Sequence, residues 1–209
     1  MKPMIRKYYL SEWFFFRKKL LPIFVILSLL FISMAFLYYD YFIDHPDRAK
    51  SIEPNFGKTF PKGSLFRENE FELIVRLFWN NLITSFGTTV SGFIPFLFLP
   101  VVTIVGLSIA TGIILSGNEL FLKLDQFSLL MSIVPHGIFE IPAIIYASSI
   151  GIYLTIQTSK MIIPKFKSKT PSPQTLCKVA GRSFILIVVP LLIIAAIVEV
   201  LVTPKPLYL

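Results

Sequence analysis

Residues 128–147 read SLLMSIVPHGIFEIPAIIYA. This stretch is apolar enough to lie in a bilayer, yet it contains a helix-breaking Pro135–Gly137 segment, the carboxylate of Glu140 and a second proline, Pro142. An ionisable residue at membrane depth costs roughly 2.5–3.5 kcal/mol on insertion scales, so a chain that keeps one there is usually using it. Backbone groups freed by a break must be satisfied by neighbouring helices or by a water-filled cavity. The stretch therefore predicts a specific site within the membrane.

The composition is that of an α-helical membrane protein. Hydrophobic residues make up 55% of the 209 positions and charged residues only 15%, and the mean hydropathy is +0.73. A soluble domain this apolar would expose large apolar patches, which argues against a soluble fold. The sequence contains long charge-free runs, and it lacks the alternation of apolar and polar residues that is typical of barrel strands. We therefore expect an all-α, polytopic transmembrane bundle. In a membrane protein, a formal net charge of +8 mainly indicates which loops lie in the cytoplasm. We expect no nucleic-acid partner.

The expected membrane helices number about five. They are residues 20–39, 77–96, 100–117, 139–158 and 184–202. Twenty residues at about 1.5 Å each span about 30 Å, the thickness of one bilayer core. The charge-free run 77–117 is too long for one crossing, and its prolines place a tight hairpin near Pro95–Pro100. Residues 127–159 are too long for one straight helix, so we expect a re-entrant or interfacial helix, a break at Pro135–Gly137, and then the fourth span.

The segments outside these spans differ in charge. Residues 1–19 mix bases with aromatics and suit either an interfacial helix or a plain anchor ahead of the first span. Residues 40–76 carry acids and bases in similar numbers, and we expect an external loop there. Residues 160–182 contain bases and no acid, which marks a cytoplasmic loop of the membrane domain 77–209. An even number of crossings separates the two basic segments, so the N-terminus is expected in the cytoplasm and the C-terminus outside.

Residues 135–143 (PHGIFEIPA) resemble the signature of the stage II sporulation protein M family of bacterial integral membrane proteins. The closing stretch AIVEVLVTP at 196–204, and Asn81 opening a glycine-bearing helix, are similar to that family as well. The resemblance extends from about Phe71 to Pro204. It implies a protein of the bacterial cell membrane with about five spans and no known catalytic activity. The family's name-giving member works in a membrane complex with peptidoglycan-degrading partners during engulfment of the forespore.

The chemistry-bearing residues do not form a recognisable catalytic motif. His136 and Glu140 are four residues apart, so on a continuous helix they would share a face. A catalytic zinc site needs about three protein ligands, whereas the chain has no HExxH and its other histidine is His45, in the expected external loop. There is also no GxSxG elbow and no glycine-rich phosphate loop. We therefore expect no enzyme activity, no metal and no cofactor.

Three interpretations of residues 135–143 stay open. Glu140 could satisfy the N–H groups freed at the break, with Pro142 in the first turn of the helix that follows. His136 and Glu140 could instead have a proton-linked or substrate-contacting role in a polar cavity. The stretch could also form a binding site for another membrane subunit. Asn81 and Glu199 complete the candidate site residues, and Glu199 is expected to pair with an asparagine of the second span or with a basic side chain.

Two functions follow as hypotheses. The first is a non-enzymatic integral membrane protein that scaffolds or regulates a cell-envelope complex, such as one that remodels peptidoglycan. The second is a permease-like subunit of an exporter that works with a separate ATPase, which a broken helix and polar residues at depth would suit. The expected partners are other membrane or envelope proteins, a second copy of the chain, and the lipid bilayer.

Overall fold

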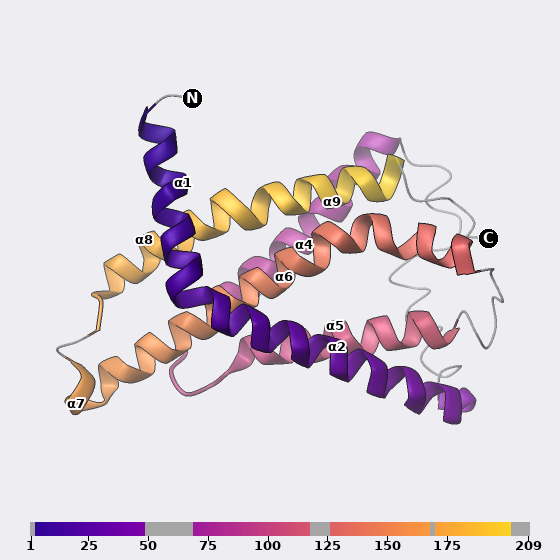
Figure 1. Ribbon diagram of the computed structural model, residues 1–209, viewed down its shortest axis with the longest axis horizontal. Coiled ribbons are helices and arrows are strands. Elements are labelled where there is room, and N and C mark those ends of the chain that lie inside the picture. The colour runs from indigo at the N-terminus through magenta and orange to yellow at the C-terminus, as the bar shows by residue number, and fades with distance from the viewer. Residues whose placement is uncertain (1–2, 49–68, 118–125, 168–169, 202–209) are drawn as a thin grey trace.

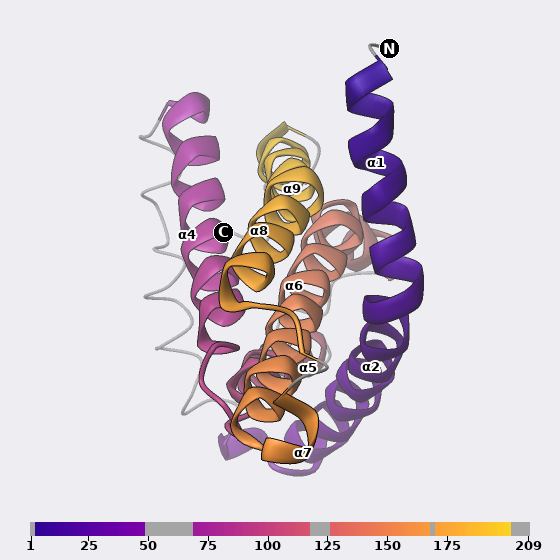
Figure 2. The same cartoon turned by 90° about the vertical axis from the view of Figure 1, so that its left-hand side faces the viewer.

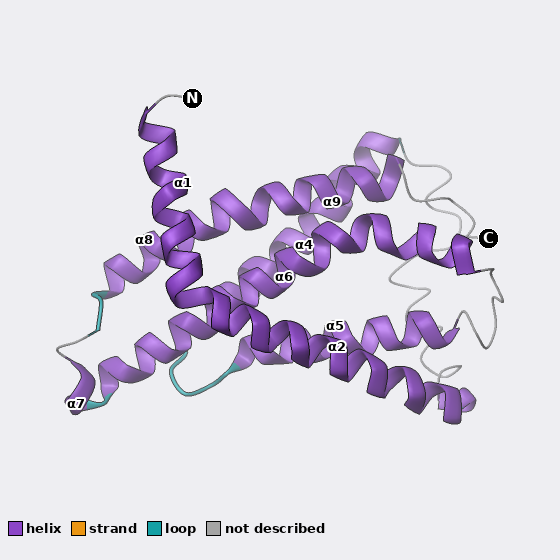
Figure 3. Ribbon diagram, viewed as in Figure 1, coloured by secondary structure: helices purple, strands orange, loops and turns teal. Residues whose placement is uncertain are grey.

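The computed structural model describes residues 3–48, 69–117, 126–167 and 170–201, with the side chains of 3–7, 126–136 and 166–167 outside the description. Within these ranges every regular element is a helix (Figure 3). The first long helix consists of α1 (Pro3–Phe15), the π-helical turn η1 (Phe16–Leu20) and α2 (Leu21–Asp44). The middle helices are α4 (Glu70–Ser91), α5 (Leu99–Gly117) and α6 (Gln126–Ile162). The last are the short α7 (Pro164–Lys167), α8 (Pro173–Ser183), the π-helical turn η3 (Phe184–Val188) and α9 (Val189–Leu201).

The long helices lie side by side along the bundle, and α1 crosses one end of it. α2, α4, α5, α6 and α9 follow the long axis of the molecule, whereas α1 stands at a steep angle to them (Figure 1). The chain changes direction between α1 and α2, at η1. The 92–98 turn and α7 lie at the same end as α1 (Figure 1).

Four stretches in the described part of the chain are long and apolar enough to cross a membrane. They are Tyr8–Asp44, Leu99–Gly117, Gly137–Ile162 and Pro173–Leu201. These helices confirm the all-α membrane bundle and roughly the number of spans. The expected second span falls on α4, which is less apolar because it carries two glutamates, an arginine and two asparagines, and which ends at Ser91 instead of at residue 96. α4 still packs along α6 and α9.

α6 contradicts the expected break in the membrane. It runs as one helix of 37 residues through Pro135–Gly137, so the expected re-entrant segment is simply its first part. In Figure 1 this N-terminal part of α6 runs in a different direction from the rest. An interior proline removes one i→i−4 hydrogen bond and typically kinks a helix, while the turns on either side remain bonded. The PHG segment therefore lies in a helix that bends but does not end.

α4 and α6 approach each other backbone to backbone. A Cβ on Gly92 would lie 2.1 Å from the carbonyl oxygen of Gly151, and a Cβ on Gly151 would lie 2.8 Å from the carbonyl oxygen of Thr88. Thr89 Oγ1 donates a hydrogen bond to the carbonyl of Ala147 at 3.2 Å across the same contact. Small residues that permit such close approach are typical of interfaces between membrane helices.

The turn between α4 and α5 is fixed to α6. The N–H of Phe96 donates a hydrogen bond to Ser159 Oγ at 2.8 Å, and Phe96 has a φ of 63°, in the left-handed region. The connection spans residues 92–98 and so begins slightly before the hairpin expected at Pro95–Pro100. This arrangement holds the α4–α5 connection at the end of the bundle where α1 lies (Figure 3).

Candidate functional site

Asn81, Glu140 and Glu199, three of the residues predicted from the sequence, come together in the bundle. They lie on α4, α6 and α9, and all three are half-buried. The Asn81 side-chain amide is close enough to the Glu140 carboxyl to interact with it, and the amide N–H is the group that can donate a hydrogen bond. The Glu199 carboxyl is close enough to Glu140 for the two to interact electrostatically. A second carboxyl thus lies near Glu199, and the expected pairing of Glu199 with an asparagine of the second span or with a base stays a prediction.

Two of the other residues predicted from residues 135–143, Gly137 and Pro142, can be placed in the structure. The side chains of Pro135 and His136 lie outside the described part of α6. Gly137 is buried and Pro142 is half-buried, and both lie in the interior of the helix. Because α6 does not break, Glu140 is not the cap of a new helix. Its partner is Asn81 on a neighbouring helix.

The chemistry open to this cluster is that of two carboxyls and an amide. Two carboxyls that interact at close range can share one proton, and the amide can hold one of them in place. Among the described residues, no three side chains of histidine, cysteine, aspartate or glutamate gather as a metal site would require. The cluster therefore places two carboxyls and one amide near one another inside the bundle.

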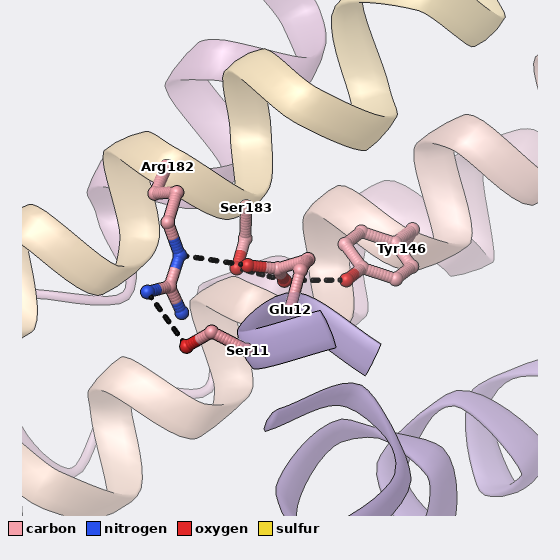
Figure 4. Close-up of polar contacts among 5 residues, drawn as sticks. All are labelled: Ser11, Glu12, Tyr146, Arg182 and Ser183. Atoms are coloured by element: carbon pink, nitrogen blue, oxygen red, sulfur yellow. Dashed lines mark hydrogen bonds and ion pairs between the residues drawn. The ribbon is translucent and has the colours of Figure 1, made fainter. Parts of the chain in front are cut away.

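A second polar cluster joins α1 to α6 and α8 (Figure 4). At its centre is Glu12, which is only 2% exposed. Glu12 Oε1 accepts hydrogen bonds from the Tyr146 phenol at 3.0 Å and from the Ser183 hydroxyl. Glu12 Oε2 accepts one from Arg182 Nε at 3.0 Å, and Arg182 Nη1 donates to Ser11 Oγ at 3.1 Å. We call Glu12, Tyr146, Arg182 and Ser183 the Glu12 clasp.

The helices that carry the Glu12 clasp depart locally from regular α geometry. The π-helical turn η1 follows α1, and the π-helical turn η3 begins directly after Ser183. Such turns re-aim side chains and are frequent at functional sites. The ring of Phe16 in η1 stacks on the ring of Tyr146, with the centroids 5.5 Å apart. Packing and hydrogen bonding thus fix the same tyrosine from two sides.

The surroundings of the Glu12 clasp are strongly basic. Within the described ranges, Glu12 is the one acidic side chain at this end of the bundle. The exposed bases there are Arg17, Lys18, Lys19, Lys160, Lys165 and Lys178. A buried carboxylate that loses its charged partner costs about 3–5 kcal/mol. The Glu12–Arg182 pair is therefore expected to matter for the attachment of α1.

Sequence reasoning missed the Glu12 clasp because its partners are far apart along the chain. Glu12 and Arg182 are separated by 170 positions, and each resembles an ordinary charge flanking a membrane helix. One signal was present: Glu12 is the single acid among the many bases of residues 1–19. An isolated acid in a basic segment indicates that it has a specific partner, but does not say which one.

The family model described as Stage II sporulation protein M matches residues 23–204, which is most of the chain. The chain belongs to this family. The resemblance drawn from residues 135–143 is thereby confirmed. No curated protein and no solved structure matches the chain.

The region matched by the stage II sporulation protein M family contains most of both clusters. Asn81, Glu140 and Glu199 lie within it, and so do Tyr146, Arg182 and Ser183. Glu12 and all of α1 lie before it. In this member of the family, the Glu12 clasp therefore attaches a helix outside the matched region to helices inside it.

Proposed function

We propose that this stage II sporulation protein M family member is a non-enzymatic protein of the bacterial cell membrane that holds a cell-envelope complex together, such as one that remodels peptidoglycan. Family membership supports the coarser part of this statement, an integral membrane protein. The finer part, a scaffold for other membrane proteins, rests on one observation: the row of exposed small and polar residues on α4.

α4 lies at the edge of the bundle (Figure 2), and its exposed side carries a row of small and polar residues among large apolar ones such as Ile83 and Phe86. Asn80, Thr84 and Gly87 are all exposed, and their spacing of four and three residues puts them on one side of the helix. A side-chain amide that faces hydrocarbon is costly unless another helix covers it. Among the described residues, nothing lies within 4 Å of a Cβ built on Gly87, so a second helix can approach there. We expect the partner to be an envelope protein that contributes a transmembrane helix with small and polar residues.

Two exposed glycines provide a matched test. Gly87 on α4 and Gly106 on α5 are both exposed, and in the described part of the chain neither has a neighbour within 4 Å of a Cβ. Gly87→Leu is expected to exclude the partner helix, whereas Gly106→Leu leaves the α4 face intact. Both variants and the wild type are purified in mild detergent at equal amounts, and bound proteins are quantified by mass spectrometry. A cell-wall hydrolase or septal protein lost only from Gly87→Leu supports the proposal, and equal recovery from both variants contradicts it.

A permease-like subunit of an exporter is the second candidate, and the Glu140–Glu199 pair favours it. Two interacting carboxyls held by Asn81 inside a helical bundle are typical of sites that move protons or substrates. Such a subunit would work with a separate ATPase. Recovery of a nucleotide-binding protein with the wild type, together with a Glu140→Gln variant that keeps this partner but loses export, would favour this function over the scaffold.

We also propose that the end of the bundle with the Glu12 clasp faces the cytoplasm. Exposed bases gather at that end, whereas Asp44, Asp47 and Glu70 lie at the opposite end. Cytoplasmic segments of membrane proteins carry an excess of lysine and arginine. The helix order then puts the C-terminus on the outer side.

A further inference from the structure

An apolar crevice separates α1 from the junction of α8 and η3. It is lined by Tyr8, Tyr9, Arg182, Ile185 and Leu186 and has a volume of about 330 Å³. This volume falls in the lower part of the range of small-molecule sites, roughly 300–1,000 Å³. The surface that lines the crevice is entirely apolar, and the guanidinium group of Arg182 extends from this wall toward Glu12 and Ser11.

We propose that this crevice binds an anionic phospholipid from the surrounding bilayer. The lipid phosphate lies against the Arg182 guanidinium, and an acyl chain follows Ile185 and Leu186. This inference goes beyond the scaffold function and does not depend on it.

The Glu12 clasp presents Arg182 to such a ligand in a fixed orientation. Nε donates to Glu12 and Nη1 donates to Ser11, so the plane of the guanidinium is held from one side. Nη2 has no partner among the described residues, and Figure 4 draws it without a dashed line. A planar guanidinium offers its remaining donors to a phosphate in a defined direction. A side chain that is already held loses less conformational entropy when the ligand binds.

A second cation lies one turn from Arg182. Lys178 is exposed and precedes Arg182 by four residues on α8, so the two share a face of the helix. The carboxylate of Glu12 is buried and balances the charge of Arg182. Lys178 therefore supplies an unbalanced positive charge one turn from the crevice, which favours an anionic headgroup over a zwitterionic one.

The walls of the crevice favour a lipid over a free phosphate ion. Ile185 is 65% exposed, and the rings of Tyr8 and Tyr9 are about half exposed. Arg182 lies just before the apolar run of η3 and α9, at the level where the membrane helix begins. Tyrosine is enriched at the boundary between headgroups and acyl chains. An acyl chain covers these apolar walls, which an inorganic ion would leave uncovered.

Native mass spectrometry of the full chain in mild detergent tests the proposal. The protein is incubated with equal amounts of phosphatidylglycerol and phosphatidylcholine, and retained lipid is counted. We expect the wild type to retain phosphatidylglycerol in preference, and Lys178→Gln to lower that preference about fivefold, as expected for one cation near the surface. Lys160→Gln removes an exposed cation from the same end of the bundle, but from α6, and is expected to leave the preference unchanged.

A second pair of variants tests the crevice itself. Ile185→Trp fills the space and is expected to lose the retained lipid, whereas Ile197→Trp alters an exposed position on α9 and is expected to keep it. Equal retention of the two lipids by the wild type overturns the proposal, and so does equal retention of phosphatidylglycerol by both tryptophan variants. Millimolar inorganic phosphate is expected not to displace the lipid. Complete displacement would instead assign the site to a free anion.

Discussion

The phenol of Tyr146 donates a hydrogen bond to the carboxylate of Glu12 at 3.0 Å, across 134 positions of the sequence. Tyr146 lies in the middle of α6, and Glu12 lies on the helix that crosses the end of the bundle (Figure 4). Both side chains are buried. The contact therefore links the interior of the bundle to α1, and removal of either partner leaves a buried polar group behind.

Replacement of Tyr146 by phenylalanine isolates this hydrogen bond. Tyr146→Phe keeps the ring that stacks on Phe16 and removes only the hydroxyl. We expect the free energy of unfolding to fall by about 2 kcal/mol, because the lost bond is to a charged acceptor. The matched control is Tyr153→Phe on the same helix, since the Tyr153 hydroxyl has no hydrogen-bond partner among the described residues. Unfolding of the two variants in denaturing detergent measures the difference, and equal losses would contradict the assigned role.

A methyl group at Gly151 is expected to clash with neighbouring atoms at the α4–α6 contact. A Cβ there would lie 2.6 Å from Pro100 Cγ and 2.8 Å from the carbonyl oxygen of Thr88, and the backbone oxygen cannot move aside. Gly151→Ala should therefore destabilise the fold by about 1–3 kcal/mol. Gly106→Ala, where nothing in the described part of the chain lies within 4 Å, should stabilise it by about 0.5–1 kcal/mol through helix propensity. Thermal unfolding in detergent measures both signs, and a tolerated Gly151→Ala would show that the helices are farther apart.

Asn81 is expected to matter to stability because it donates to Glu140. Asn81→Leu removes the donor and should cost about 1–3 kcal/mol. Asn80→Leu changes the exposed neighbour and should have little effect on the isolated protein. In a Glu140→Gln background the cost of Asn81→Leu should shrink, since an uncharged amide depends less on the donor. Equal costs in the two backgrounds would show that Asn81 acts by packing and not through Glu140.

The single cysteine reports the orientation of the bundle. Cys177 is exposed on α8, at the end with the Glu12 clasp. We expect a membrane-impermeant maleimide to leave Cys177 unlabelled in intact cells and to label it after permeabilisation. In a Cys177→Ser background, Asp47→Cys moves the probe to the opposite end, where labelling of intact cells is expected. The reverse pattern would invert the proposed topology.

The sequence predicted the features that depend on composition and local order. Apolar runs separated by polar segments were sufficient to predict an all-α membrane bundle, and residues 135–143 were sufficient to predict the family. Asn81, Glu140 and Glu199 were singled out because polar groups are rare in apolar helices. That these three residues lie close together could not be predicted from the sequence, because it depends on how α4, α6 and α9 pack.

Two features were not predictable from local sequence. The break expected at Pro135–Gly137 was wrong because a helix break and a helix bend have the same local pattern, and tertiary packing decides between them. The Glu12 clasp was missed because the pairing of Glu12 with Arg182 and Tyr146 depends on the crossing of α1 over the bundle. Such long-range pairing has no periodicity in the sequence.

The most direct test of the Glu12 clasp is a double-mutant cycle between Glu12 and Arg182, measured as the free energy of unfolding in detergent. Arg182→Ala should cost about 3 kcal/mol or more, because it leaves the buried Glu12 carboxylate uncompensated. Glu12→Ala should also destabilise the protein, because Tyr146 and Ser183 lose their buried acceptor. The double variant should cost less than the sum, with a coupling of about 1–3 kcal/mol. The same cycle between Glu12 and the exposed Lys178 should be additive. Additive costs for Glu12 and Arg182 would contradict the claim that this pair binds α1 to the bundle.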